Sequence, residues 1–298
     1  MEYDVKAMMY VVALFACCAP TALFAQQTLE QYAKSHPLVI QTVGQQAGLG
    51  LEASDQTNNL ASGNKVLALS NKGLTSIEGI AKLRVRDGGR DMAFSEVSNV
   101  HLFLSNNKLM SLPPEFFDLE GVRWVYLHHN QLDAIPPQFA RMKHLLGMYF
   151  TGNNISAIPP EVFTMSQLRK LQVSKNHLTE LPSEIGKLTE LRHLNLANNE
   201  IPAVPASIGN LHKLRVCDLS GNKIFSLPEE FGKVKIVHQL RVSDNPLTGL
   251  PTGFVNMPGT IDITGTKIDP ATLPPAIRAK LSRDKPPGKE KPRKTVRD

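Results

Sequence analysis

Cysteine is scarce in this chain, which has three in 298 residues. Cys17 and Cys18 are adjacent near the N-terminus, so Cys217 is the only cysteine in the rest of the chain. This excludes a disulfide framework. Because Cys217 replaces a leucine in the apolar pattern described below, we expect a small, buried hydrophobic side chain there.

The short motifs of common active sites are also missing. There is no glycine-rich phosphate-binding loop, no nucleophile elbow and no grouping of cysteine with histidine. His128 and His129 are neighbours and should point in different directions, and His101 should lie on the order of 13 Å away along the strand direction. Metal ligands must converge within about 2 Å of a zinc ion. We therefore expect no metal, no cofactor and no enzyme; an enzyme using the histidines and an inserted loop is a distant alternative.

A net charge of +6 gives little reason to expect a nucleic-acid partner. The segment from Lys280 to the C-terminus holds eight basic and three acidic residues, a net +5, so the basic excess belongs chiefly to this tail. Residues 282–298 are rich in proline, lysine and arginine, which predicts a disordered basic tail. Contact of the tail with an anionic membrane or polymer is the alternative to simple solvation.

The long apolar run of the chain lies at residues 10–25 and is interrupted by Pro20, so a membrane span is not expected. It ends in Ala25 before Gln26, which predicts a signal peptide over residues 1–25 and a secreted or periplasmic protein. The rival interpretation is a lipobox, Leu14 to Cys17, with Cys17 acylated. Membrane attachment is expected only in that case.

One stretch recurs with the pattern LxxLxLxxNxLxxLPxxIxxL, and its clearest copy runs from Leu191 to Leu211. A fixed period of this length indicates a solenoid. The LxL part alternates as a strand does, and the apolar spacing after the proline suits a turn of helix or 3₁₀-helix. The asparagine recurs every 23 residues, at Asn107, Asn130, Asn153, Asn176, Asn199, Asn222 and Asn245.

This pattern resembles the leucine-rich repeat family, and its LPxxIxxL half is similar to the 23-residue subtype of Ras-suppressor, Scribble-like and many bacterial proteins. The resemblance implies an α/β solenoid with a parallel sheet on the concave face and short helices or turns on the convex face. It also implies a scaffold that binds ligands, usually proteins. The absence of cysteine-rich caps favours an exported bacterial-type member.

The recurring asparagines have a structural interpretation. Each lies where a strand ends and the chain turns inward, and its amide carries both donors and acceptors. Backbone groups that the turn leaves without partners need such bonds. We therefore expect a structural asparagine ladder rather than a row of binding residues.

The repeat pattern predicts the domain boundaries. Residues 26–65 fall outside it and are expected to form an N-terminal cap, and the leucine-rich-repeat domain spans 66–281 with about nine repeats. Lys72 takes the first asparagine place and Thr266 the last. The 35 residues from Lys72 to Asn107 exceed the period by twelve, which predicts an insertion near 84–97 that emerges as a charged, solvated loop.

Strand alternation assigns the variable residues to a face, because side chains six, four and two places before each asparagine should point into the concave groove. The single tryptophan of the chain falls on this face. Aromatic side chains exposed on a rigid sheet are good binding anchors; the alternative is that they shield one another in stacks or lie beneath a loop. The predicted partner-binding residues are His101, Phe103, Trp124, Tyr126, His128, Tyr149, Lys170 and Gln172.

Asp218, Arg241 and Asp262 should be lateral neighbours on the same face. Two concave carboxylates suggest a glycosidase, but the arginine between them would keep both ionised, which is wrong for a general acid. We therefore expect a cross-strand charge ladder. The residues seven places before their asparagines should form a basic rim along one edge of the sheet. Its role is either solvated pairing with acidic side chains or attraction of an acidic partner. These residues are Arg123, Arg169, Arg192 and Arg215.

The expected function is that of a non-catalytic recognition protein that binds a protein or peptide on the concave sheet. The resemblance supplies the kind of function, and the aromatic residues supply the place. The alternative is a binder of glycans or cell-envelope polymers, with the same aromatic rings stacked on sugar faces.

Overall fold

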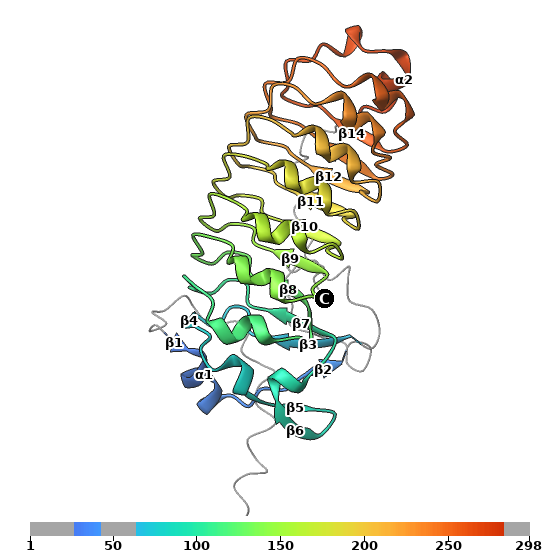
Figure 1. Ribbon diagram of the computed structural model, residues 1–298. Helices are drawn as coiled ribbons and strands as arrows, with labels where there is room; N and C mark the ends of the chain where they lie inside the picture. Colours follow the sequence, from blue (N-terminus) through green and yellow to red (C-terminus); the bar gives the residue numbers. More distant parts are fainter. Residues whose placement is uncertain (1–26, 43–63, 283–298) are drawn as a thin grey trace, which may run out of the picture.

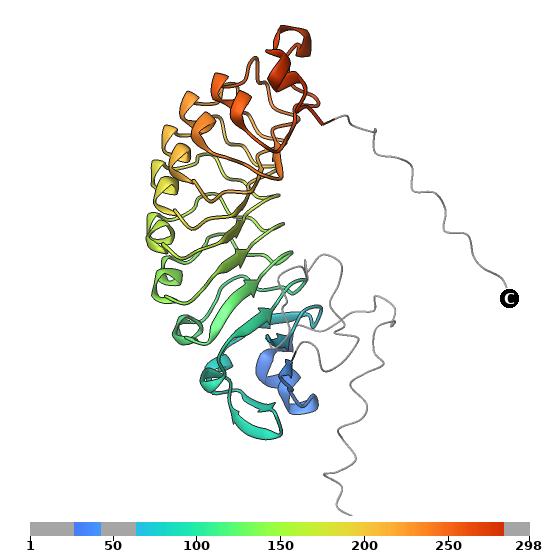
Figure 2. The ribbon, with the colours of Figure 1, turned by 90° about the vertical axis from the view of Figure 1, so that its right-hand side faces the viewer.

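The protein is a curved solenoid, seen in the computed structural model, which describes residues 27–42 and 64–282 (Figure 1). The predicted signal peptide lies outside the described residues, as does the predicted basic tail after Ser282. Among the described residues, no helix is long and apolar enough to cross a membrane. Viewed from the side, the strands line the inner face of the curve and the short helical turns line the outer face (Figure 2).

A ten-stranded sheet forms the inner, concave face. Its strands run parallel and in sequence order, except for the antiparallel pair β2–β3 at one end. The alternation of leucine with variable residues explains this arrangement, because the leucine side can be buried against the convex turns. The repeat strands are β3 (Lys65–Ala68), β7 (Val100–Phe103), β8 (Val122–Tyr126), β9 (Gly147–Tyr149), β10 (Lys170–Gln172), β11 (His193–Asn195), β12 (Val216–Asp218), β13 (Gln239–Arg241) and β14 (Thr260–Asp262).

Short 3₁₀-helices form the convex face, one in each regular repeat. Each starts directly after a proline with an extended ψ, because the ring fixes φ near the value that the first turn requires. In each repeat, the exposed polar turn that follows this proline brings the next apolar residue of the pattern against the sheet. These elements are η7 (Pro114–Asp118), η8 (Pro137–Arg141), η9 (Pro160–Thr164), η10 (Ser183–Lys187), η11 (Ala206–Asn210), η12 (Glu229–Lys233) and η13 (Thr252–Asn256).

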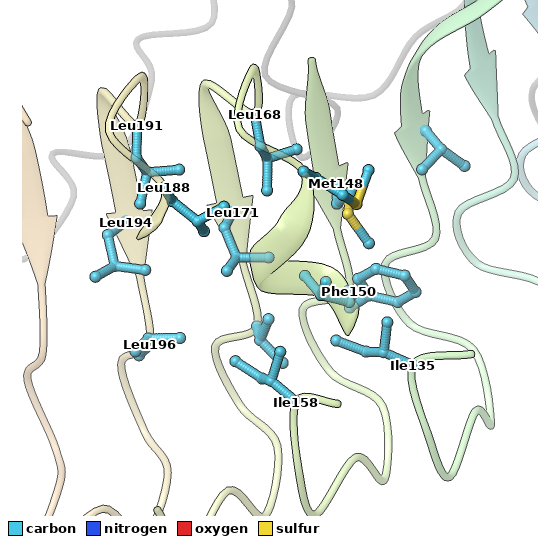
Figure 3. Close-up of a cluster of buried hydrophobic side chains, with 14 of the residues drawn as sticks. Ile135, Met148, Phe150, Ile158, Leu168, Leu171, Leu188, Leu191, Leu194 and Leu196 are labelled. Atoms are coloured by element: carbon cyan, nitrogen blue, oxygen red, sulfur yellow. The ribbon is translucent and has the colours of Figure 1, made fainter. Parts of the chain in front are cut away.

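The core is one continuous cluster of apolar side chains between sheet and convex turns (Figure 3). Leu171 and Leu194 are lateral partners on adjacent strands, and both are fully buried. Cys217 is the next residue in this row and is also fully buried, which confirms its role as a small core side chain. Burial raises the pKa of its thiol, so it stays protonated and inert.

The asparagine ladder has the structural role that was predicted. Asn153 accepts a hydrogen bond from the backbone N–H of Leu132 (3.1 Å) and donates to the carbonyls of Leu127 (3.0 Å) and Phe150 (2.9 Å). The same bonds recur at the other six asparagines. At the last repeat Thr266 substitutes by donating its hydroxyl to the Ile263 carbonyl (2.7 Å).

The residue before each ladder position has a left-handed backbone, which the repeat pattern did not lead us to expect. His129 and Asp244 have φ of 51° and 52°, and Gly152 has φ of 70°. This conformation turns the chain away from the strand so that the following asparagine points inward. Glycine, asparagine and aspartate tolerate it best, and they fill most of these positions.

The N-terminal end of the solenoid is covered by other elements. The helix α1 (Leu29–Ser35) follows β1 (Gln27–Thr28), which pairs with β4 (Leu74–Ser76). The strand β2 (Gln41–Thr42) pairs with β3 and so covers the backbone groups at the edge of the main sheet.

The insertion is a β-hairpin with its own contacts, so the expectation of a solvated loop was wrong. Strands β5 (Arg84–Asp87) and β6 (Arg90–Ala93) pair antiparallel, and Gly88 and Gly89 supply the positive φ of the tight turn. The 3₁₀-helix η6 (Phe94–Glu96) follows. The backbone of Arg86 bonds to Leu38 and Ile40, and Asp87 pairs with Lys65 at 2.6 Å.

The C-terminal end is covered in a similar way. After η14 (Pro270–Thr272), the helix α2 (Pro275–Arg278) returns the chain to the last strand. The Ile261 N–H donates to the Lys280 carbonyl (2.9 Å), and the Ser282 N–H donates to the Ile261 carbonyl (2.7 Å). These bonds give hydrogen-bond partners to the backbone N–H and carbonyl of Ile261 at the edge of β14.

Candidate functional site

The strand register places the predicted concave residues side by side. One lateral row contains His101, Trp124, Gly147, Lys170 and His193, in that order. The next row contains Phe103, Tyr126, Tyr149 and Gln172. The sequence period therefore assigned both rows correctly, since each step between repeats moves the chain by one strand.

The central aromatic residues form a stack rather than an open surface. The rings of Phe103 and Tyr126 are 4.1 Å apart with an interplanar angle of 4°, and those of Tyr126 and Tyr149 are 4.4 Å apart at 14°. All three side chains have 0% exposure, and together with Val66 they form a second hydrophobic cluster. The expected exposure was wrong for these three, and mutual shielding is the interpretation that the geometry supports. Their role in binding stays a prediction.

Two histidines at the margin of this cluster are buried as well. The His101 ring contacts the Tyr126 hydroxyl through Nδ1 (3.2 Å) and the Asn64 amide through Nε2 (3.1 Å). His128 packs its edge against Tyr149, with the ring centroids 5.5 Å apart. Burial lowers the pKa of both histidines from 6.5 to about 4, and the neighbouring His129 adds to the effect at His128. Both rings are therefore neutral at neutral pH.

We expect the protein to become less stable as the pH falls from about 6.5 to 4. An unfolded histidine has a pKa near 6.5, whereas His101 and His128 in the folded state have a pKa of about 4, so the unfolded chain binds more protons in this interval. The contribution of the neutral rings is fully present above pH 6.5 and is lost through this window. The slope reaches up to about 1.4 kcal/mol per pH unit for each histidine. Urea unfolding at a series of pH values measures it.

Two variants check the assignment. Replacing His128 by phenylalanine should reduce the slope, because the group that takes up the proton is gone. Replacing the exposed His129 by asparagine, which tolerates its left-handed backbone, should change the slope less, because His129 is only the second cause of the lowered pKa of His128. An unchanged slope in His128→Phe would contradict the assignment.

Trp124 is the member of the aromatic group that is only partly buried. Its indole lies over Gly147, where an added Cβ would come within 2.1 Å of the ring. Lys170, on the far side of that glycine, has its Nζ 6.0 Å from the ring centre. Burial lowers the pKa of Lys170 to about 8. The repeat pattern did not predict the role of Gly147, although its place between a tryptophan and a lysine in one row was the available signal.

The concave face is more accessible over its C-terminal half. His193, Asn195 and Gln239 on β11 and β13 are half-buried, and Arg241 and Thr260 are exposed. By contrast, Lys170 and Gln172 on β10 are 8% and 7% exposed. We call strands β11 to β14 the accessible half of the concave face. It begins one strand beyond β10, which carries the Lys170 that contacts Trp124.

The charged residues of this half form only part of the expected ladder: among the described ion pairs, Arg241 pairs with Asp218 but not with Asp262. The Arg241 guanidinium lies 3.4 Å from Asp218 Oδ2, while Asp218 Oδ1 accepts from the Ser220 N–H and hydroxyl. Asp262, on the next strand, accepts from the N–H and hydroxyl of Thr264. Both carboxylates are thus used as acceptors in local turns, so neither is placed as a general acid. In the part of the chain that the structure describes, no group of three or more His, Cys, Asp or Glu residues could hold a metal ion.

Comparison with known proteins agrees with this geometry. Residues 159–242 match the family model described as a leucine-rich repeat region, and residues 100–119 match the one described as a leucine-rich repeat. This chain contains leucine-rich repeats. The solved structures similar to it include bacterial leucine-rich repeat proteins, and the 23-residue subtype remains an expectation.

Three of these structures illustrate the likeness. A leucine-rich repeat protein of Leptospira interrogans is 26% identical with a TM-score of 0.61, over 69% of this chain and 56% of that one. The structure of PEPR1–AtPEP1 is 26% identical (TM-score 0.51), over 57% of this chain and 26% of that one. Internalin C2 of Listeria monocytogenes is 22% identical with a TM-score of 0.53, over 66% of this chain and 80% of that one. At this identity the likeness shows the fold alone. The match thus spans little more than half of the Leptospira protein. Among curated proteins, none matches this chain.

Proposed function

We propose that this leucine-rich repeat protein is a non-catalytic recognition scaffold that binds a protein or peptide on its concave sheet. The observation that carries the proposal is the accessible half of that face, bordered by the half-buried indole of Trp124. A partly exposed tryptophan held against a lysine is a good anchor, because its large rigid ring loses little entropy on binding. His101, Phe103, Tyr126, His128, Tyr149, Lys170 and Gln172 would support that anchor from beneath.

A protein or peptide partner also agrees with the family. Leucine-rich repeat proteins generally mediate protein–protein recognition, and the similar structures include PEPR1–AtPEP1. A glycan is the less supported partner, since sugars stack on exposed aromatic faces. Here the faces of Phe103, Tyr126 and Tyr149 are packed against one another, which leaves Trp124 for such a contact.

Selection of a random displayed peptide library on the purified protein tests the proposal. We expect selected peptides to bind, and Trp124→Ala to weaken their binding at least tenfold. Phe225→Ala is the matched control, because this aromatic ring is 64% exposed and lies after β12, outside the sheet. Equal binding by the native protein and Trp124→Ala would place the site elsewhere. Direct binding of oligosaccharides, with no peptide selected, would favour the glycan alternative.

We also propose that the protein acts outside the cytoplasm. The support is the apolar run of residues 10–25 with Ala25 at its end, which lies outside the described residues. Sequencing the N-terminus of the protein isolated from its source should give Gln26 as the first residue. An acylated Cys17 would identify a lipoprotein instead, and an intact Met1 would rule out both forms of export.

A further inference from the structure

A row of cations follows the edge of the sheet at which the strands begin. Arg169, Arg192 and Arg215 directly precede β10, β11 and β12, and His238 precedes β13. Their backbones form a hydrogen-bonded ladder: the Arg192 N–H donates to Arg169 (2.8 Å), Arg215 to Arg192 (2.8 Å) and His238 to Arg215 (3.1 Å). Successive rungs are therefore one strand apart, about 4.8 Å. The fold thus places three arginine residues at equivalent positions of adjacent repeats.

Little negative charge compensates this row. Among the described residues, Arg169, Arg192 and Arg215 make no ion pair. The nearby carboxylate, Glu190, pairs with Lys213 and is also attracted by Arg192 and Arg169. One carboxylate therefore faces several cations, and the excess of positive charge along the row attracts an anion.

Groups beside the row respond to the same positive potential. Burial, and after it the charges of Lys170, His238, Arg215 and Arg192, lower the pKa of His193 to about 4. His193 lies on the concave face at the first position of β11. The positive field of the row therefore extends onto the accessible half of the sheet.

The row opens onto a groove of about 450 Å³, which we call the basic groove. None of the carboxylates in the described part of the chain lines it. The Val237 side chain is 46% exposed in this groove, so an apolar contact is available beside the charges. The lining includes four cations and two apolar side chains: Arg192, Lys213, Arg215, Lys235, Leu214 and Val237.

We propose that the basic groove binds an acidic peptide segment in which carboxylates alternate with aliphatic side chains. Guanidinium groups bind carboxylates in bidentate fashion, and the groove presents two of them, Arg192 and Arg215, beside the exposed Val237. The exposed valine favours a peptide over a uniformly charged polymer, which has no aliphatic group to place there. The short row also favours a short segment over a long polyanion. This inference goes beyond the proposed function, because the groove lies at the edge where the strands begin and not on the concave face.

Fluorescence anisotropy with the full chain tests the inference. The probe is a short labelled peptide of alternating glutamate and valine, and its matched control has glutamine in place of glutamate. We expect the glutamate peptide alone to bind, and its affinity to fall as salt is raised because exposed charges are screened. The double variant Arg192→Glu/Arg215→Glu should weaken binding at least tenfold. The control is the double variant Lys108→Glu/Lys267→Glu, which changes the net charge by the same amount. Both lysines follow the strands instead of preceding them, so this variant should bind the peptide as the native protein does.

The outcomes separate the two proposals. Glutamate-peptide binding that needs Arg192 and Arg215 but not Trp124 would support the basic groove and count against the concave site. Library peptides that need Trp124, with no preference for glutamate, would overturn the inference and leave the proposed function standing. Equal binding of the glutamate and glutamine peptides would overturn it too. So would binding of single-stranded DNA, polyphosphate or anionic vesicles in preference to the glutamate peptide, since the partner would then be a different anion.

Discussion

Replacing Asn153 by alanine should lower the free energy of unfolding by about 3–5 kcal/mol. The side chain is 5% exposed and bonds three backbone groups in two repeats. Its loss leaves the buried N–H of Leu132 without a partner, while the carbonyls of Leu127 and Phe150 each keep a second donor, from Asn130 and Asn176. One orphaned donor costs about 1–3 kcal/mol, and two lost bonds add about 1 kcal/mol each. The midpoint of urea unfolding measures the change.

The adjacent asparagine provides the control. Asn154 has the same side chain but is exposed, so Asn154→Ala should change the midpoint little. A similar effect of both substitutions would mean that helix or strand propensity, rather than the ladder bonds, determines the loss in free energy of unfolding. Because a solenoid is coupled chiefly between neighbouring repeats, a broadened transition in Asn153→Ala would indicate that the two ends unfold separately.

Tyr126→Ala should destabilise the protein by about 3–5 kcal/mol, the range for deleting a fully buried aromatic ring. Its ring has 0% exposure and is stacked between Phe103 and Tyr149, so truncation leaves a cavity that both neighbours border. Thermal and urea unfolding measure the loss. A native-like midpoint would show that the ring is not packed in solution. Tyr126 would then again be a candidate for an exposed binding residue.

Tyr126→Phe separates packing from hydrogen bonding. It keeps the stacked ring and removes the hydroxyl that contacts His101 Nδ1 at 3.2 Å, so we expect a loss of only about 1 kcal/mol. The comparison matters for binding studies. A loss of binding in Tyr126→Ala would mix stability with recognition, whereas Trp124, which is partly exposed, can be replaced with a smaller effect on folding.

The period of Asn107 to Asn245 predicted more of this protein than composition or charge did. It gave the parallel sheet, the lateral order of Phe103, Tyr126 and Tyr149, and the neighbours Asp218, Arg241 and Asp262. A repeat that advances one strand at each period fixes these neighbours, because strand alternation then decides the face. The ladder bonds followed from the same pattern, since a turn with buried backbone groups needs an internal partner.

Exposure could not be predicted in this way. Alternation says that Tyr126 points into the concave groove, but not whether other groups cover it there; the tertiary structure gives 0% exposure. The insertion shows the same limit: its two glycines suggested a solvated loop, yet β5 and β6 pair as a hairpin and Arg86 bonds to residues far away in sequence. Trp124 over Gly147 and the basic groove at Arg192 and Arg215 also depend on side-chain placement across strands. The sequence by itself determined the scaffold, because its period is local and repeated. The tertiary structure decided which residues are available to a partner, because burial depends on contacts between segments that no local pattern specifies.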